Sequence, residues 1–271
     1  MPELPEVETA RRGLAPALRA QRILGLVVRE RRLRVPLDAT TEDAVAGQRI
    51  LNLRRRAKYL ILELERGALL LHLGMSGSLR LVTEDTPYRP HDHVELVLAN
   101  GLKLRFHDPR RFGLVQWTPG PAEAHPSLSG LGPEPLAAVF DGAYLHRRAQ
   151  GRRAAVKTFI MDQRIVVGVG NIYASESLHL AGIHPARAAG CIAAPGYERL
   201  ATSIKTVLEH AIEQGGTTLR DFVREDGAPG YFSRALRVYG RADAPCLTCG
   251  TPIQPLRLGQ RASFFCPHCQ R

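Results

Sequence analysis

The first residues of the chain could carry covalent chemistry. The sequence begins Met-Pro-Glu-Leu-Pro-Glu, and removal of the initiator methionine, usual before a small second residue, would expose the secondary amine of Pro2. An α-amino group titrates near pH ~8, so part of it is uncharged at physiological pH and can form an imine with a sugar aldehyde carbon. Glu3 and Glu6 would supply neighbouring carboxylates. The alternative is an ordinary helix start, with Pro5 in the first turn and Glu6 and Glu8 at the positive end of the helix dipole.

The cysteines form a second pattern. Four of the five lie in the last 26 residues, as two Cys-x-x-Cys pairs separated by sixteen residues: Cys246, Cys249, Cys266 and Cys269. Two thiolate pairs at this spacing can bind one Zn²⁺ tetrahedrally. Four cysteine ligands leave no open position, and so short a tail needs the metal for its folding energy. We therefore predict one structural zinc, with a redox pair as the weaker alternative.

The positive charge of the chain points to a polyanionic partner. The net charge is +11, from 37 Lys and Arg against 26 Asp and Glu. This excess favours nucleic acid, although a generally basic surface is the alternative. The segment between the cysteine pairs is suited to a two-stranded hairpin, on which Arg257 and Arg261 could contact phosphates.

Four short motifs could take part in such binding. The glycines of Val166–Leu178 allow close backbone approach, and Asn171 could cap the helix that follows, which together would make a phosphate site. A tight turn between helices is the alternative. The motif Asp108–Gly113 places Arg110 and Phe112 on one turn after a strand, where they could reach a base edge and stack in a duplex.

The glycine-rich tip His72–Gly77 carries Met75, which is either a core residue or a wedge. Phe112 likewise could return to the core.

The basic run Arg54–Tyr59 is either a solvated strand edge or a phosphate clamp. Further basic groups lie at 91–93 and 152–157. The His-Asp-His run at 91–93 has no third ligand at a telling spacing, so it gives a metal site little support.

The chain of 271 residues is long enough for two domains, and its apolar runs are too short to span a membrane. No basic region followed by an apolar stretch opens the sequence, so we expect a cytoplasmic protein.

Apolar periodicity predicts a helix over about 1–20 and another over Tyr197–Gln214. Short strands are predicted at Ile23–Val28, Tyr59–Leu64, Ala68–Leu73, Ser78–Val82, Val94–Leu98, Leu102–Phe106 and Leu114–Trp117. Such strands suggest an antiparallel sandwich or barrel, with Asn100-Gly101 as a two-residue hairpin turn. Residues 119–135 read as a linker, and 215–232 as a mobile loop.

These motifs together resemble one family. The opening nine residues, Arg56–Tyr59, His72–Gly77, Asp108–Gly113, Val166–Glu176 and the four-cysteine tail occur in the order found in bacterial formamidopyrimidine-DNA glycosylases. The resemblance implies an α+β fold: an N-terminal antiparallel β-sandwich flanked by helices over 1–132, a helix-two-turn-helix domain over 133–240 and a zinc finger over 241–271. Leu4 and Val7–Thr9 favour this branch over its sister, endonuclease VIII.

The resemblance also implies a bifunctional DNA glycosylase/AP lyase that removes oxidised purines through a proline imine. By it, Pro2 attacks C1′ of the damaged nucleotide, Glu3 is the general acid and Glu6 supports it. Lys58 would aid β-elimination, and Arg261 would bind the flanking phosphates and serve δ-elimination.

The DNA contacts implied by the resemblance are equally specific. Met75, Arg110 and Phe112 would fill the gap left by the everted base, and Arg110 would read the orphan cytosine. The positions implied to hold phosphates are His91, Arg153, Lys157 and Asn171. One departure, Thr158-Phe159, stands where a proline-bearing pair is expected.

The expected partner is double-stranded DNA with oxidised bases or abasic sites, bound by a monomer in the cytoplasm at the nucleoid. Two alternatives remain: an oxidised-pyrimidine glycosylase like endonuclease VIII, or a non-catalytic zinc-ribbon DNA-binding protein.

Overall fold

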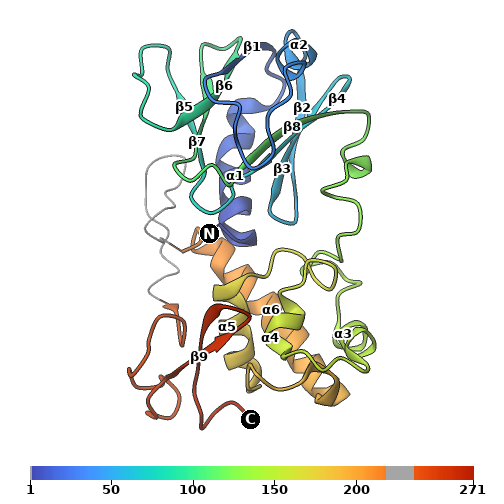
Figure 1. The fold of residues 1–271 in the computed structure, drawn as a ribbon, viewed down its shortest axis with the longest axis vertical. Helices are drawn as coiled ribbons and strands as arrows, with labels where there is room; N and C mark the ends of the chain where they lie inside the picture. Colours follow the sequence, from blue (N-terminus) through green and yellow to red (C-terminus); the bar gives the residue numbers. More distant parts are fainter. Residues whose placement is uncertain (1, 218–234) are drawn as a thin grey trace. The chain divides into compact units, whose positions relative to one another are not determined.

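The computed structural model describes residues 2–217 and 235–271 (Figure 1). The chain divides into two compact units, which are described separately. Among the described residues, the first unit contains 2–130 and 215–217, and the second contains 131–214 and 235–271. The break after residue 130 falls inside the segment 119–135. Of the loop expected at 215–232, residues 218–232 lie outside the described part of the chain.

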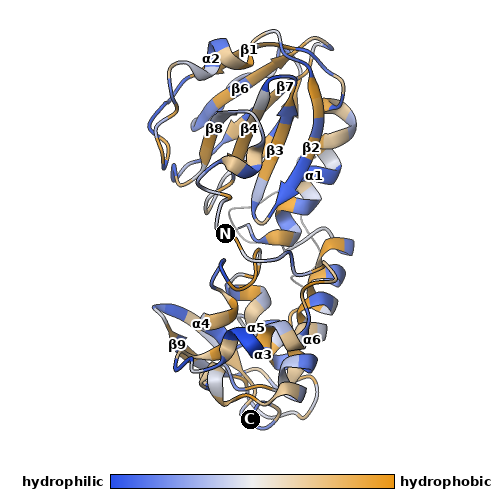
Figure 2. Ribbon diagram, turned by 90° about the vertical axis from the view of Figure 1, so that its right-hand side faces the viewer, coloured by the Kyte–Doolittle hydropathy of each residue, from blue (hydrophilic) through white to orange (hydrophobic). Residues whose placement is uncertain are grey.

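The first unit contains two four-stranded antiparallel sheets, as the strand pattern predicts. One has the order β1–β6–β7–β5, with β1 at Ile23–Val28, β6 at Asp92–Leu98, β7 at Lys103–His107 and β5 at Ser78–Val82. The other has the order β2–β3–β4–β8, with β2 at Ile50–Arg56, β3 at Tyr59–Leu64, β4 at Gly67–His72 and β8 at Leu114–Pro119. Figure 2 shows apolar residues concentrated along these strands.

Helix α1 (Leu4–Leu18) completes the core of the first unit. Its apolar side chains at helical spacing, Val7, Leu14 and Leu18, are buried in one cluster with residues of both sheets. The helix packs against β2 and β3. Its start is therefore fixed relative to the β2–β3 hairpin, and Figures 1 and 2 show the start of α1 and the end of β2 at the same end of this unit.

Three local features differ from the sequence prediction. Strand β2 was not predicted, because its second half is three arginines; pairing with β3, and ion pairs of Arg54 with Glu63 and Glu123, keep them in a strand. The short helix α2 (Thr41–Val45) was also missed. The β6–β7 loop has three residues rather than two: Leu98 N–H donates to the Leu102 carbonyl at 3.0 Å, and Gly101 has φ +82°. This is the pattern of a loop closed by a glycine bulge.

The second unit is built around α6 (Ala194–Glu213), on which α3 (Gly142–Ala149) and α5 (Asn171–Ala181) pack. Helix α6 begins three residues before the predicted start because a proline, which suits the first turn, lies there. Helix α4 (Val156–Ile160) packs on α5, and single 3₁₀ turns lie at Ala122–Ala124 in the first unit and Ala189–Cys191 in the second. No helix in 2–217 or 235–271 has the length and apolar character needed to cross a bilayer.

The C-terminal hairpin pairs β9 (Gln254–Leu258) with β10 (Arg261–Phe265), as predicted. Hydrogen bonds attach it to the end of α5. Gln270 Nε2 donates to the Ile183 carbonyl at 2.9 Å, and Arg271 N–H donates to the Gly182 carbonyl at 3.1 Å. The hairpin is thus joined to the helical part of its own unit by polar contacts.

Candidate functional site

The two N-terminal carboxylates form a reciprocal capping box. Glu3 caps α1: its side chain accepts the Glu6 backbone N–H, and its own N–H donates to Glu6 Oε2 at 2.8 Å. Glu6 Oε1 also accepts the N–H and hydroxyl of Thr217 at 2.9 and 3.0 Å. Both glutamates are 2 % exposed. The helix-start interpretation is therefore confirmed, and the capping geometry fixes both carboxylates in the first turn of α1, directly after the buried Pro2.

Lys58 lies in the two-residue turn between β2 and β3. Arg56 pairs with Tyr59, and the intervening Ala57 has φ +54°, which a non-glycine residue rarely adopts. Arg55 Nη1 donates to the Ala57 carbonyl at 2.9 Å and so closes the turn. Lys58 is only 6 % exposed, which is unusual for a lysine at a hairpin tip. The turn is thus built to hold a lysine inside rather than in solvent.

Glu8 joins this turn to α1. Its carboxylate binds Arg55 Nε at 3.1 Å and also receives Arg11 and Arg12. Burial alone would raise the pKa of Glu8, but the hydrogen bonds from Arg11 and Arg12 and the charges of Arg11 and Arg55 hold it below its usual value. Glu8 therefore stays ionised and ties the helix that carries the acids to the turn that carries Lys58.

Two loops of the first unit bring together the predicted gap-filling residues. We call 73–77 the Met75 loop and 108–113 the Arg110 loop. Met75 and Phe112 are 36 % and 43 % exposed, so neither returns to the core. The Arg110 guanidinium lies over the Phe112 ring at 5.1 Å. Gly74, at φ +63°, brings the loops together: a Cβ there would lie 2.4 Å from the Phe112 carbonyl carbon.

Two histidines flank these loops. His91 is exposed, has φ +70° and accepts the Asp108 N–H on its carbonyl at 3.0 Å. His72, at the end of β4, accepts the Gly74 N–H on Nδ1 at 2.9 Å. Burial, then the charges of Lys58 and Arg34, lower the pKa of His72 to about 4. His72 is therefore neutral at physiological pH and can act as this acceptor.

In the second unit, Lys157 and Asn171 bind the zinc hairpin. Lys157 is 1 % exposed, and its Nζ donates to Asn171 Oδ1 and Ser263 Oγ, both at 2.7 Å. Asn171 Nδ2 donates to the Ala262 carbonyl at 2.9 Å. The prediction that Asn171 caps α5 is wrong, because Gly170 is the cap and Asn171 is the first helical residue. Its amide instead holds β10 beside Arg261.

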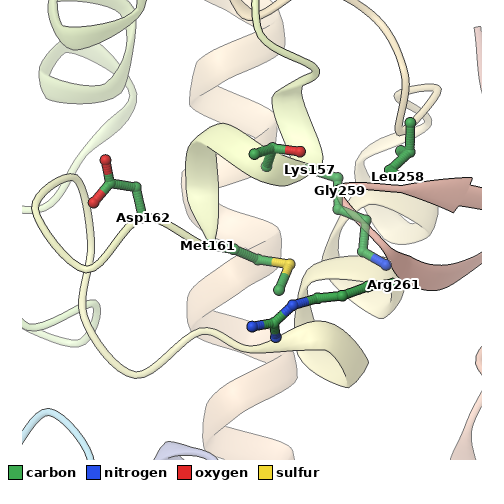
Figure 3. A pocket seen from close by; sticks show the side chains of 7 residues that line it. Lys157, Met161, Asp162, Leu258, Gly259 and Arg261 are labelled. Atoms are coloured by element: carbon green, nitrogen blue, oxygen red, sulfur yellow. The ribbon is translucent and has the colours of Figure 1, made fainter.

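A pocket of about 330 Å³ lies next to this contact. Its lining residues are Lys157, Thr158, Met161, Asp162, Leu258, Gly259 and Arg261. Figure 3 shows Arg261 and Met161 extending toward one another from the hairpin and from the end of α4. Helix α4 runs without interruption through Thr158, so the departure from the family pattern does not break the backbone. A guanidinium beside an open pocket suits phosphate binding. Arg153, the remaining predicted phosphate contact, is exposed before α4.

The four cysteines form a metal site. Their sulfurs lie within 4.8 Å of one another, and three pairs are 3.4, 3.5 and 4.0 Å apart. Ligands about 2.3 Å from a tetrahedral zinc lie about 3.8 Å apart, so the spacing fits one Zn²⁺. The N–H groups of Thr248 and Cys269 donate to Cys246 and Cys266 sulfur, each at 3.4 Å, as thiolates require. The cluster of four excludes a simple redox pair.

Two buried acids in these motifs were given no role by the sequence. Glu176 is 3 % exposed and accepts the backbone N–H groups of 237, 238 and 239 at 2.8–3.0 Å. It fixes the segment that leads to the zinc site. Asp108, the first residue of the Arg110 loop, is fully buried. Their signal in the sequence was an acid inside a basic motif for Asp108, and inside a largely apolar motif with two glycines for Glu176.

Comparison with protein families matches three consecutive parts of the chain. Residues 1–115 match the formamidopyrimidine-DNA glycosylase N-terminal domain, and residues 131–223 match its H2TH domain. Residues 244–271 match the zinc finger found in the same glycosylase and in IleRS.

Whole proteins match over the same extent. A formamidopyrimidine-DNA glycosylase of Methylococcus capsulatus is 59 % identical over 271 residues, which is all of both chains. The Lactococcus lactis Fpg protein in complex with Fapy-dG-containing DNA has a TM-score of 0.91 and 32 % identity, covering 99 % of this chain and 100 % of that one. Its complex with abasic-site DNA matches with the same TM-score and identity, covering 99 % of each chain.

Proposed function

The chain belongs to the formamidopyrimidine-DNA glycosylase family, and from this we propose that it excises oxidised purines, including 8-oxoguanine and formamidopyrimidines, from duplex DNA and then cleaves the strand. The observation that carries the proposal is the buried capping box, which holds Glu3 and Glu6 beside Pro2. The complexes of the Lactococcus lactis protein with Fapy-dG and abasic DNA support the substrate.

In the proposed reaction, the Pro2 nitrogen attacks C1′ and the bond from C1′ to the base breaks. Glu3 donates the proton that assists base loss and opening of the sugar ring, and Glu6 holds Glu3 through the capping box. The resulting iminium acidifies the C2′ proton. Loss of this proton expels the 3′ phosphate, with Lys58 contacting the backbone. A second elimination, served by Arg261, expels the 5′ phosphate.

The reaction requires removal of Met1. With Met1 attached, the Pro2 nitrogen belongs to an amide and has no free electron pair for attack. A copy that retains Met1 should bind DNA and carry out neither base removal through the imine nor strand cleavage.

The base must leave the stack before it can be attacked, and the gap must be filled. We assign gap filling to Met75 and Phe112, whose exposed side chains lie on adjoining loops, and reading of the orphan cytosine to Arg110. His91 and Arg153 are proposed to hold phosphates.

Lys157 and Asn171 are proposed to act on phosphates largely through β10. Their bonds to Ala262 and Ser263 fix strand β10, which begins at Arg261. The zinc ion supplies folding energy to the hairpin when bound by the four cysteines, and no bond-breaking step needs it. We retain the division at 1–132, 133–240 and 241–271, and a monomer acting at the nucleoid in the cytoplasm, as parts of this proposal.

Borohydride trapping tests the imine. Protein whose mass shows loss of Met1 is mixed with a duplex containing 8-oxoguanine or an abasic site opposite cytosine, and reduced. We expect a covalent adduct, and Pro2→Gly should greatly decrease it. Absence of the adduct from correctly processed wild-type protein would overturn the mechanism.

A lesion panel separates the proposal from its nearest alternative. Preference for thymine glycol over 8-oxoguanine would favour an endonuclease VIII-like enzyme. DNA binding without any base release would favour the non-catalytic alternative, against which the buried Glu3 and Lys58 argue.

A further inference from the structure

The carboxylate of Asp108 bonds to both gap-filling loops. Its Oδ2 accepts the Gly113 N–H at 2.7 Å, at the end of the Arg110 loop. Its Oδ1 accepts the Ser76 hydroxyl at 3.1 Å, in the Met75 loop. The side chain is fully buried. A buried carboxylate must be hydrogen-bonded to be tolerated, and these two bonds satisfy it where the Arg110 loop meets the Met75 loop.

At two glycines of these loops, the surrounding atoms leave no room for a Cβ. A Cβ at Gly113 would lie 2.9 Å from Asp108 Oδ2 and 2.8 Å from the His72 carbonyl oxygen, so glycine is required where the carboxylate meets the chain. Gly74 has the same constraint against Phe112. Two loops that are distant in sequence therefore meet at two points, one between backbones and one through Asp108.

We propose that Asp108 is a positioning residue that locks the Met75 and Arg110 loops into one rigid two-pronged probe. This inference rests on the proposed function, because the probe is the device that enters the duplex. Met75 and Phe112 must enter the base stack together to fill one gap. Loops already locked lose little conformational entropy on insertion, whereas loose loops would have to be ordered at that moment.

The main chain of Asp108 permits a clean test. Its N–H donates to the His91 carbonyl at 3.0 Å, and its carbonyl accepts His93 Nε2 at 2.8 Å and the Arg111 N–H at 3.2 Å. These bonds survive substitution of the side chain. Asp108→Ala removes both side-chain bonds, the one to Gly113 within the Arg110 loop and the one to Ser76 that joins the two loops, whereas Ser76→Ala removes only the second. Asp108→Asn can keep both, because its Oδ1 accepts from Gly113 and its amide donates to Ser76 Oγ.

The experiment compares borohydride trapping rates on an abasic duplex and on the same abasic strand alone. A single strand has no stack to enter, so only the duplex rate depends on the probe. We expect Asp108→Ala to lower the duplex rate on the order of 10- to 100-fold, because displacements of about 1 Å have such effects. Ser76→Ala should lower it less, and Asp108→Asn should stay near wild type. Asp85→Ala, in an exposed loop of the same unit, is the matched control.

The single-strand rate should change less than about twofold in every variant, since the imine chemistry is untouched. A fluorescent base beside the abasic site should unstack on binding to wild type and much less on binding to Asp108→Ala. An unchanged duplex rate in Asp108→Ala, or an equal loss on both substrates in Ser76→Ala and Asp108→Ala, overturns the inference. Failure of wild-type protein to form any adduct overturns the proposed function instead, so the two failures are distinguishable.

Discussion

The β-sandwich and the zinc hairpin each hold a cationic side chain beside a β-turn, Lys58 in one and Arg261 in the other, but by different means. The turn of Lys58 is supported by a large apolar core, to which both sheets and α1 contribute. In the described part of the chain, the apolar cluster beside the hairpin of Arg261 is small, with four buried residues: Val238, Cys246, Ile253 and Cys266. The hairpin relies on a metal and on polar contacts to its own unit. A large core and a small metal site therefore perform the same positioning task.

Removal of zinc should show the largest difference in stability between the two regions. Structural zinc contributes roughly 10–16 kcal/mol in isolated fingers, so chelation or Cys249→Ser should unfold the hairpin and lose most DNA affinity. The melting transition of the first unit should remain. Differential scanning calorimetry with zinc content measured in parallel checks this. Leu60→Ala is the converse variant: it should destabilise the first unit by about 2–5 kcal/mol with zinc content unchanged. Loss of both transitions on chelation would contradict the comparison.

Acid should weaken the first unit through His72. Its pKa falls from 6.5 unfolded to about 4 folded, so the unfolded state binds more protons between these values. The contribution of neutral His72 to the free energy of unfolding is therefore complete above pH 6.5. It is lost as the pH falls toward 4, and the loss is about 3 kcal/mol at most. Denaturant unfolding from pH 7 to 4 measures it. His72→Asn keeps an acceptor for the Gly74 N–H and should make the free energy of unfolding depend less on pH. An equal dependence on pH in the two proteins would exclude His72 as the cause.

A charge substitution before α4 should have the smallest effect. Arg153 is exposed, so Arg153→Ala should leave both folding transitions unchanged. If it contacts one phosphate, it should weaken binding to all DNA sequences similarly and reduce the salt slope by about 1. Titrations of DNA affinity against salt check this, with Arg164→Ala as a second exposed arginine of the same unit. An unchanged slope in Arg153→Ala would remove it from the interface.

The sequence predicted most of what depends on local pattern. The cysteine spacing identified the metal site, the alternating strands identified the sandwich, and Glu3 with Glu6 identified a helix start with acids in place. These features depend on residues close together in the chain. The sequence also exposed the pairing of Met75 with Phe112 as a hypothesis, although each motif alone left a core role open.

The features it missed depend on distant partners. Strand β2 exists because β3 pairs with it and Glu63 neutralises Arg54, neither of which the arginine run reveals. The side chain of Asn171 is of a type that caps helices, but its amide instead binds Lys157 and the Ala262 carbonyl. The role of Glu176 depends on the backbone N–H groups of 237–239, and that of Asp108 on the Ser76 hydroxyl, and only the fold brings these donors near. Tertiary contacts thus overrode local propensity wherever a polar side chain became buried.

The bonds between Glu6 and Thr217 have a consequence for biosynthesis. They join two residues 211 positions apart. The ribosome makes the amine-bearing end of the chain first, and Met1 can be removed while synthesis continues. The carboxylate that steadies Glu3 gains the two donors of Thr217 only after residue 217 of 271 has been made. The nucleophile is therefore synthesised early, whereas Thr217, which helps to hold its acid partner, is synthesised late. A nascent chain would carry a reactive amine without the arrangement that makes it an efficient enzyme.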